Sequence, residues 1–268
     1  MKLPVYTLAK EKTKERNLPV HFNEEYRPDL IKRAVLALQS AAQHVYGAYP
    51  NAGQRHSSKT RKRRRDYRGT YGFGISRAQR KILSRRGMRM FWVGATSPQT
   101  VGGRRSHPPK VEKILQERIN KKENRKAIRS AIGATINKGL VAKRGHKVPA
   151  EYPFIVDSDV EKITKTKELQ TILEKFGLVE ELARSSIKKI RSGRGKLRGR
   201  RYHRKKGPLI VVSGECPLSR AGKNIAGVDV VAVKSLNAVH LAPGSLPGRL
   251  TLWTEGAIEV LENEKLFL

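Results

Sequence analysis

Two separate stretches of this 268-residue sequence concentrate cationic side chains. From Arg55 to Arg105, 16 Lys and Arg residues stand against a single acid, Asp66. Residues 188–206, KKIRSGRGKLRGRRYHRKK, hold 11 basic residues and no acid. Guanidinium groups bind phosphate oxygens through paired hydrogen bonds, and ammonium groups attract them as point charges. The chemistry that these residues predict is binding of a polyanion.

The whole chain carries the same signal. It has 57 Lys and Arg against 23 Asp and Glu, a formal net charge of +34, whereas a small soluble domain carries a charge of magnitude about 2–8. Nucleic acid is therefore the first candidate partner. A membrane surface is the second, but neither a basic amphipathic helix nor a lipidation motif is present.

Aromatic residues and glycines lie among the arginines of the first stretch. Tyr67, Tyr71, Phe73, Phe91 and Trp92 offer surfaces on which unpaired bases can stack, and glycine lets a backbone approach closely. This combination favours a segment that threads between RNA helices. The alternative is a disordered, solvated basic linker, and a solvated charged loop is the corresponding alternative for the second stretch.

Signatures of other chemistry are weak. The Gly-Lys pairs at 195–196 and 222–223 complete no P-loop, GRGKLRG has one residue too many for GxGxxG, and the seven histidines show no metal-binding spacing. A turn after a strand explains Asp157 and Asp159 better than a metal site does. The one cysteine, Cys216, excludes an internal disulfide and reads best as a small buried thiol. We expect no catalytic residues, no metal and no cofactor.

Regular elements surround the basic stretches. Apolar periodicity predicts helices over 28–45, 120–136 and 178–190, the last with Leu182, Ala183, Ile187 and Ile190 facing inward, and a final helix capped by Thr254. Continuous apolar runs at 152–157, 208–213, 228–233 and 249–254 predict buried parallel strands. The fold class is α/β, a mostly parallel sheet covered by helices in a Rossmann-like layer.

Residues 47–109 show no such periodicity, and they interrupt the chain between the first and second helices. A structureless insertion of this length is improbable unless it is functional or disordered. The predicted organisation is a globular α/β domain of residues 1–46 and 110–268, a long extended basic loop of 47–109 inserted after the first helix, and a second basic segment, 191–207. The loop is expected to be mobile in the free protein and ordered only against RNA.

Several stretches resemble the archaeal and eukaryotic form of the L-four family of large-subunit ribosomal proteins. They are GAYPNAGQR, RGTYGFG, VGGRRSHPPK, INKKENRKAIRSAIGAT, SGRGKLRGRRYHRKKGPLIVV, NIAGVDVV and LAPGSLPGRLTLWTEGAI. The resemblance covers nearly the whole chain. It implies a structural, non-enzymatic protein with an α/β domain on the solvent side of the large ribosomal subunit and a loop that passes through ribosomal RNA (rRNA) to the peptide exit tunnel.

By this resemblance RGTYGFG matches the family's basic Gly-Thr-Gly-Arg element near the tunnel, although Tyr71 interrupts the element and Phe73 stands in place of its Arg. The implied exit-tunnel tip is Arg68, Gly69, Thr70, Tyr71, Gly72 and Phe73. The implied rRNA-binding residues are Arg55, Lys59, Arg61, Lys62, Arg63, Arg64, Arg65, Arg77, Arg80, Lys81, Arg85, Arg86, Arg89, Arg104, Arg105 and Lys110 in the loop, and Arg191, Arg194, Lys196, Arg198, Arg200, Arg201, Arg204 and Lys205 in the second segment.

The resemblance also implies partners and a location. The partners are large-subunit rRNA, neighbouring large-subunit proteins including the L-twenty-two family at the tunnel, and the nascent polypeptide. The expected location is the cytoplasm, on the ribosome and not in a membrane. Two other functions stay open: a nucleic-acid-modifying enzyme whose α/β core binds a nucleotide, with SGECPLSRAG after LIVV as its best phosphate turn, and a basic protein that compacts DNA.

Overall fold

The computed structural model describes residues 1–60, 62–67, 69–74 and 76–268. The chain divides into two compact units, which are described separately: an α/β unit, Met1–Ala42 with Gln116–Leu268, and a loop unit, Gln43–Leu115. Of the residues that the sequence singles out, Arg61 and Arg68 lie outside the described residues.

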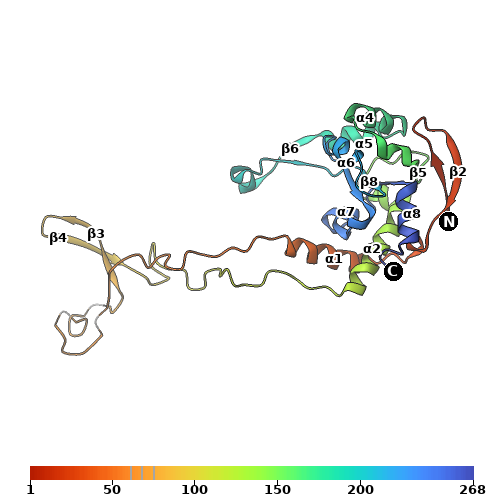
Figure 1. Ribbon diagram of the computed structural model, residues 1–268. Coiled ribbons are helices and arrows are strands. Elements are labelled where there is room, and N and C mark those ends of the chain that lie inside the picture. Colours follow the sequence, from red (N-terminus) through yellow and green to blue (C-terminus); the bar gives the residue numbers. More distant parts are fainter. Residues whose placement is uncertain (61, 68, 75) are drawn as a thin grey trace. The chain divides into compact units, whose positions relative to one another are not determined.

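A six-stranded sheet organises the α/β unit (Figure 1). Its strands stand in the order β2-β1-β5-β10-β8-β9, and all neighbours pair in parallel except β1 and β2. The strands are β1 (Lys2–Tyr6), β2 (Lys12–Asn17), β5 (Ile155–Val156), β8 (Leu209–Val212), β9 (Asp229–Ala232) and β10 (Thr251–Thr254). The expected mostly parallel α/β sheet is confirmed. The antiparallel pair β1–β2 was not predicted, because the residues of β2, KTKERN, include no apolar side chain.

Helices cover both faces of this sheet. They are α1 (Pro28–Ala41), α2 (Lys121–Ile136), α3 (Lys138–Lys143), α4 (Thr166–Lys175), α5 (Val179–Ser186), α6 (Leu218–Lys223), α7 (Ala238–Leu241) and α8 (Glu255–Asn263). Short 3-10 turns join them: η1 (Val20–Asn23), η2 (Ser158–Lys162), η3 (Gly193–Arg198), η4 (Val233–Ser235) and η5 (Pro243–Ser245).

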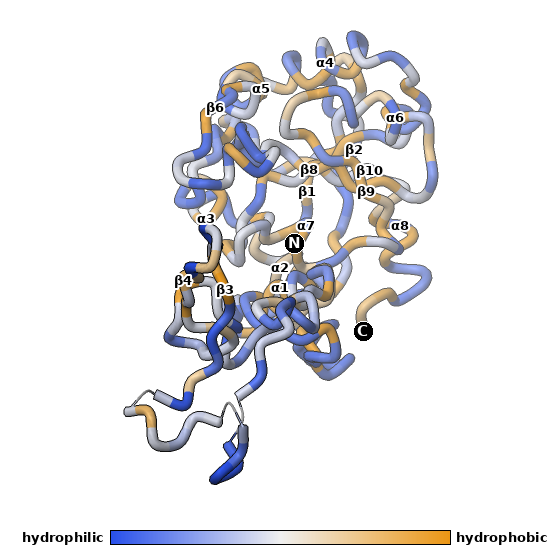
Figure 2. The backbone as a smooth tube through the Cα atoms, turned by 90° about the vertical axis from the view of Figure 1, so that its left-hand side faces the viewer, coloured by the Kyte–Doolittle hydropathy of each residue, from blue (hydrophilic) through white to orange (hydrophobic). Residues whose placement is uncertain are grey.

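Strand alternation divides the core into two layers. Leu209 and Val211 of β8 pack with α1, α2, α7 and α8, whereas Ile210 and Val212 pack with α3, α4 and α6 on the other face. Successive side chains of a strand point to opposite faces, so a strand that is apolar throughout must be covered on both. In Figure 2 the strand β8, whose sequence is LIVV, is coloured as hydrophobic.

The expected helix starts are borne out by local contacts. Pro28 stands at the first turn of α1, where its missing N–H costs nothing. The Thr254 hydroxyl accepts a hydrogen bond from the N–H of Ala257 and caps α8, as predicted.

Two predicted helix ends are wrong. The helix expected over 178–190 ends at Ser186, and the chain continues as β6 (Lys188–Ile190), which pairs antiparallel with β7 (Tyr202–Arg204). Ile187 and Ile190 are therefore 52% and 59% exposed instead of facing inward. The Ser185 and Ser186 hydroxyls donate to the carbonyls of Leu182 and Ala183, and such local serine hydrogen bonds compete with helix continuation. Helix α1 likewise ends at Ala41, which leaves Val45 exposed.

The loop unit contains two extended legs and a β-hairpin. Residues 43–56 and 97–115 run side by side in Figure 1, and the N–H of Ala48 donates to the carbonyl of Pro109 over 3.0 Å. The strands β3 (Arg80–Arg86) and β4 (Arg89–Gly94) pair antiparallel with a bulge between Ile82 and Ser84. Sequence periodicity misses this hairpin, because a bulge breaks the alternation of side chains between the two faces.

Removing the loop unit is expected to leave the α/β unit folded, because both layers of its core consist of residues outside 43–115. The N–H of Glu117 donates to the Ser40 hydroxyl, so the cut ends lie close together. We predict that replacing residues 43–115 by Gly-Ser-Gly-Ser-Gly keeps cooperative thermal unfolding and, through the shorter loop, raises stability by up to about 2 kcal/mol. Calorimetry of both chains measures this, and a broad, non-cooperative transition would contradict it.

Candidate nucleic-acid interface

The basic side chains of the loop unit are directed to solvent. All of the expected contact residues that are described there are exposed, except Arg80, Lys81 and Arg104, which are half-buried. Among the described residues, none of the ion pairs involves a Lys or Arg between 43 and 115. This charge is therefore not neutralised within the described chain, and a polyanion would bind it without breaking an existing ion pair.

Arginines of the loop unit already stack on its aromatic rings. The guanidinium carbons of Arg64 and Arg77 lie 6.0 and 4.6 Å from the ring centroid of Tyr71, and Arg55 lies 4.1 Å from that of Tyr49. Arg77 also donates to the Tyr71 hydroxyl over 3.1 Å. These contacts hold arginine side chains at set positions while their outer N–H groups remain available to phosphates.

The segment expected to form the tip has glycine-dependent turns. Gly72 and Gly74 have φ values of +85° and +64°, which only glycine adopts without strain. The N–H of Gly69 donates to the carbonyl of Asp66, and the Phe73 side chain is 70% exposed. The described part of the segment therefore presents an aromatic ring on a tight turn.

A compact turn cluster, formed by Gly53, His56, Ser58 and residues 94–104, closes the end of the two legs. Both ring nitrogens of His56 are engaged, Nε2 with the Thr96 hydroxyl over 2.8 Å and Nδ1 with the Ser58 hydroxyl over 2.7 Å. An added Cβ at Gly103 would collide with the carbonyl oxygen of Ser97, and the N–H of Gly103 donates to the carbonyl of Thr100. The Gly-Gly of VGGRRSHPPK is thus needed for close packing of the chain on itself.

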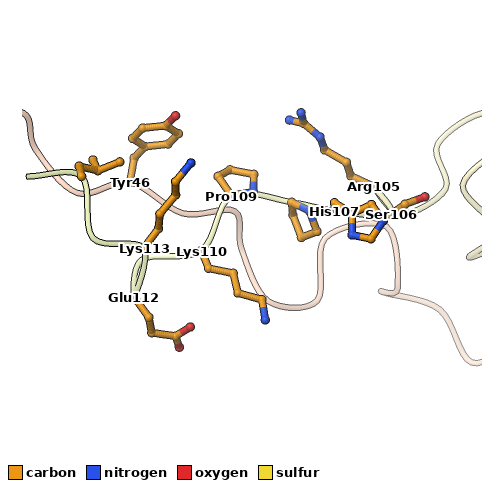
Figure 3. Close-up of a pocket in the computed structure, with 10 residues that line it drawn as sticks. Tyr46, Arg105, Ser106, His107, Pro109, Lys110, Glu112 and Lys113 are labelled. Atoms are coloured by element: carbon orange, nitrogen blue, oxygen red, sulfur yellow. The ribbon is translucent and has the colours of Figure 1, made fainter. Parts of the chain in front are cut away.

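A cavity of about 730 Å³ opens between the legs of the loop unit (Figure 3). Tyr46 and Lys113 stand on the same side of it as the Pro109 ring and the Arg105 guanidinium, whereas Lys110 points to the other side. An exposed tyrosine ring between cations suits a base with its phosphates. Sequence reasoning selected Arg105 and Lys110 but missed Tyr46 and Lys113, which flank the expected boundaries at 47 and 109.

The second basic segment is a hairpin of the α/β unit. In Figure 1 it projects beside α5 and α6, with η3 at its turn. All of the expected contact residues from Arg191 to Lys205 are exposed. The Lys188 ammonium lies 3.8 Å from the ring centroid of Tyr202 on the paired strand, and among the described residues none of these side chains has a carboxylate partner.

Two carboxylates, the fully buried Glu181 and the half-buried Asp229, hold the base of this hairpin. The Glu181 side chain is fully buried and binds Nδ1 of His146 over 2.7 Å, the N–H of Lys147 over 2.9 Å and Nε of Arg184 over 2.7 Å. Arg184 in turn donates to the carbonyl of Lys206, the last residue of the hairpin. Sequence reasoning missed Glu181, although a lone acid on the apolar face of an expected helix could have drawn attention to it.

The second carboxylate is Asp229. It accepts from the buried guanidinium of Arg249 over 2.6 Å and from the Lys206 ammonium over 2.9 Å. Arg249 also donates to the carbonyls of Gly207 and His240. The returning strand of the hairpin is therefore held to α5 through Glu181 and Arg184 and to β9 through Asp229, which orients the exposed cations.

The electrostatics of the first cluster are set by burial and by its partners. Burial alone raises the pKa of Glu181, but hydrogen bonds from Arg184, His146 and the Lys147 N–H lower it to about 2. Burial lowers the pKa of His146 from its ordinary value, so the imidazole is neutral at pH 7. Glu181 is thus a permanent anion that compensates Arg184.

The Glu161 carboxylate occupies the topological switch point of the sheet, where the helices that follow two neighbouring strands lie on opposite faces. Strands β8 and β10 are neighbours, but α6 follows the first on one face and α8 follows the second on the other. At such a point α/β proteins bind anionic ligands. Here Glu161 accepts from the N–H and hydroxyl of Ser213 over 2.9 and 2.5 Å and from the hydroxyl of Thr254 over 2.6 Å. These donors are not available to a nucleotide phosphate.

Within the described residues, no group of three or more His, Cys, Asp or Glu side chains could hold a metal ion, and no helix of that part of the chain is long and apolar enough to cross a membrane. Cys216, expected to be buried, is half-buried, with its Sγ 3.8 Å from the Ser219 hydroxyl.

Comparisons with known proteins give a consistent result. The model of the ribosomal protein L4/L1 family matches residues 17–264. The chain is 48% identical to the large ribosomal subunit protein uL4 of Nanoarchaeum equitans over the full length of both chains. It is 47% identical to the uL4 protein of Methanocaldococcus jannaschii, covering 98% of this chain and 99% of the relative, and 45% identical to that of Archaeoglobus fulgidus, covering 97% and 98%.

Acid is expected to destabilise the α/β unit through the Glu181 cluster. Because the folded pKa of Glu181 lies below its ordinary 4.5, this stabilisation is complete above pH 4.5 and is lost as pH falls towards about 2, about 3 kcal/mol in total. Because the pKa of His146 is also lowered, a further part of the folding stability is lost as pH falls below 6.5. We predict that Glu181→Gln lowers the free energy of unfolding by about 3 kcal/mol at pH 7, and that the stability of this variant changes less with pH than that of the unmodified chain. Urea unfolding at several pH values tests this, with exposed Glu180→Gln as the control; equal pH profiles would refute it.

The turn cluster is expected to persist without RNA. In the free chain, the amides of Thr100 and Arg104, which donate backbone hydrogen bonds within the cluster, should exchange with deuterium more slowly than those of the exposed residues 62–66. Gly103→Ala overpacks the turn by about 1–3 kcal/mol, which lowers their protection about 10- to 100-fold. Gly214→Ala, where an added Cβ meets open space, is the control. Uniformly fast exchange in the unmodified chain would show that the cluster forms only on binding.

Proposed function

The chain belongs to the ribosomal protein L4/L1 family, and on this premise we propose that it is a structural component of the large ribosomal subunit that binds large-subunit rRNA and supports its assembly. Relatives that match it over their whole length are named as large-subunit proteins. The proposal includes no enzymatic step, and it places the protein in the cytoplasm as part of the ribosome.

The observation that carries the proposal is the uncompensated charge of two separate extended segments. In the described parts of 55–105 and of 191–205 no Lys or Arg has a carboxylate partner, whereas Lys and Arg elsewhere in the α/β unit form many ion pairs. Phosphate contacts supply most of the affinity in such interfaces. The same residues named from the sequence are therefore proposed to bind rRNA, with Tyr46 and Lys113 added from the cavity of the loop unit.

The loop unit is proposed to be the long basic loop that threads rRNA and lines the exit tunnel. Support comes from its extended paired legs, its exposed cations and the glycine turns at 69–74. The exposed Phe73 ring at this turn is the proposed tunnel-facing group, next to the nascent polypeptide and to a protein of the L-twenty-two family. The α/β unit is proposed to be the globular domain, with the hairpin of residues 188–206 as its second anchor on rRNA.

The alternatives have less support. A nucleotide-binding enzyme needs a free anion site after a parallel strand, but Glu161 takes the donors at the switch point. A protein that compacts DNA needs no preference for RNA shape, and the Arg-stacked aromatic rings suit unpaired bases, which duplex DNA does not expose.

Neutralising the hairpin is expected to weaken binding through lost phosphate contacts. We predict that changing Arg194, Lys196 and Arg198 together to Gln lowers the affinity for a large-subunit rRNA transcript and reduces the slope of log K against log salt by about 2–3. Filter binding at 50–200 mM salt measures both quantities.

The matched control removes the same charge from α4 and its N-cap, by changing the exposed Lys165, Lys167 and Lys175 to Gln; only Lys165 has an ion-pair partner, Glu168. Its salt slope should remain close to that of the unmodified chain. If both variants lost affinity and salt slope equally, net charge alone, and not the hairpin, would govern binding. Equal affinity of the unmodified chain for duplex DNA and for the transcript would favour the DNA-compacting alternative.

A further inference from the structure

The two edges of the six-stranded sheet differ in how well they are protected against pairing with a further strand. The β2 edge carries Lys12, Lys14 and Arg16, and charged side chains of this kind prevent another strand from pairing. The β9 edge has the sequence DVVA, and its one charged residue, Asp229, is already bound to Arg249 and Lys206. Edge β9 therefore lacks the protection that edge β2 has.

The outer backbone groups of β9 have no partner. The N–H of Asp229 donates to the carbonyl of Pro208, so by the alternation of the ladder the N–H groups of Val230 and Ala232 point away from β8. Outside the ladder, no hydrogen bond among the described residues reaches these two N–H groups or the carbonyl of Val230. These two donors and one acceptor stand at the spacing of an extended polypeptide, whereas the carbonyl of Ala232 accepts from the Ser235 hydroxyl.

A groove with a volume of about 950 Å³ runs along this edge. Val230, Val231 and Ala232 line it, with residues of α6 on one side and His240 of α7 on the other. These two helices pack on opposite faces of the sheet, so the groove is open at the strand edge. The buried Nδ1 of His240 has no hydrogen-bond partner among the described residues.

We infer that the β9 edge is a docking site for an extended acidic segment of another protein, which adds a seventh strand to the sheet. The inference rests on the proposed function, because the partner is a protein of the same ribonucleoprotein particle. Arg220 and Lys223 line the groove together with one acid, Glu215, so its lining is net positive, and neither basic residue forms an ion pair among the described residues. They supply the charge complementarity for a carboxylate on the incoming segment.

RNA fits this site less well than a polypeptide does. From Leu209 to Leu268 the chain has five basic and six acidic residues, so this region lacks the cationic excess of the two rRNA-binding segments. A row of alternating N–H and C=O groups matches another backbone in extended conformation, whereas the sugar-phosphate chain has no N–H groups to pair with it. The occupant is therefore a protein segment.

Hydrogen exchange with resolution of single amides tests the inference on the full chain in three states: free, bound to a large-subunit rRNA transcript, and within assembled large subunits. The Val230 and Ala232 amides are expected to exchange rapidly in the first two states and at least about tenfold more slowly in the third. Fast exchange in the assembled subunit would overturn the inference.

Protection by the transcript alone would assign the edge to RNA, and protection that grows with the concentration of the free chain would assign it to a second copy; either result overturns the inference. A chain that fails to enter the subunit at all refutes the proposed function first, and the inference falls with it.

The variant Ala232→Pro tests the backbone contact directly. Ala232 has φ −68°, which proline adopts, and the N–H that proline removes points outward. This variant is expected to fold and to enter the subunit, yet to lose the protection at Val230. Ala232→Ser, which keeps the N–H, should be protected like the unmodified chain. Full protection in Ala232→Pro would contradict strand addition.

Discussion

Like-charge repulsion is the constraint on which the rest of this molecule depends. In the described residues of 55–105 and 191–205, Lys and Arg have no carboxylate partners within the chain, so these segments cannot collapse onto a core without a cost in electrostatic energy. They remain extended, as two paired legs and a hairpin. In the α/β unit outside the hairpin, by contrast, many acids and bases pair with one another.

Two of the 23 acidic residues of this chain lie where the basic hairpin joins the folded part of the α/β unit. Glu181 and Asp229 bind Arg184 and Arg249, which in turn bind backbone carbonyls at the base of the basic hairpin. A buried carboxylate satisfied by several donors is stable only in one arrangement. This arrangement fixes the direction of the hairpin. The ion pairs at its base thereby orient the exposed, unpaired cations that it carries.

The α/β unit shows how a fold associated with ligand binding can serve a structural role. Glu161 fills the switch point with an internal carboxylate, and the remaining open features are surfaces: the basic hairpin and the β9 edge with its groove. The proposed function and the proposed docking of a strand both depend on what its segments and edges contact. The described parts of the chain offer no enclosed reaction site.

The sequence alone determined the α/β class, four of the six strands, the capped helix α8 and the positions of the cationic segments, because apolar periodicity and charge are local properties of the chain. Only the tertiary structure decided where Glu181 and Asp229 bind, why α5 ends at Ser186, that Glu161 closes the switch point and that Tyr46 faces Lys113 across the legs. These depend on residues distant in sequence meeting in space. The bulged β3–β4 hairpin escaped prediction for a local reason, since one extra residue breaks the period.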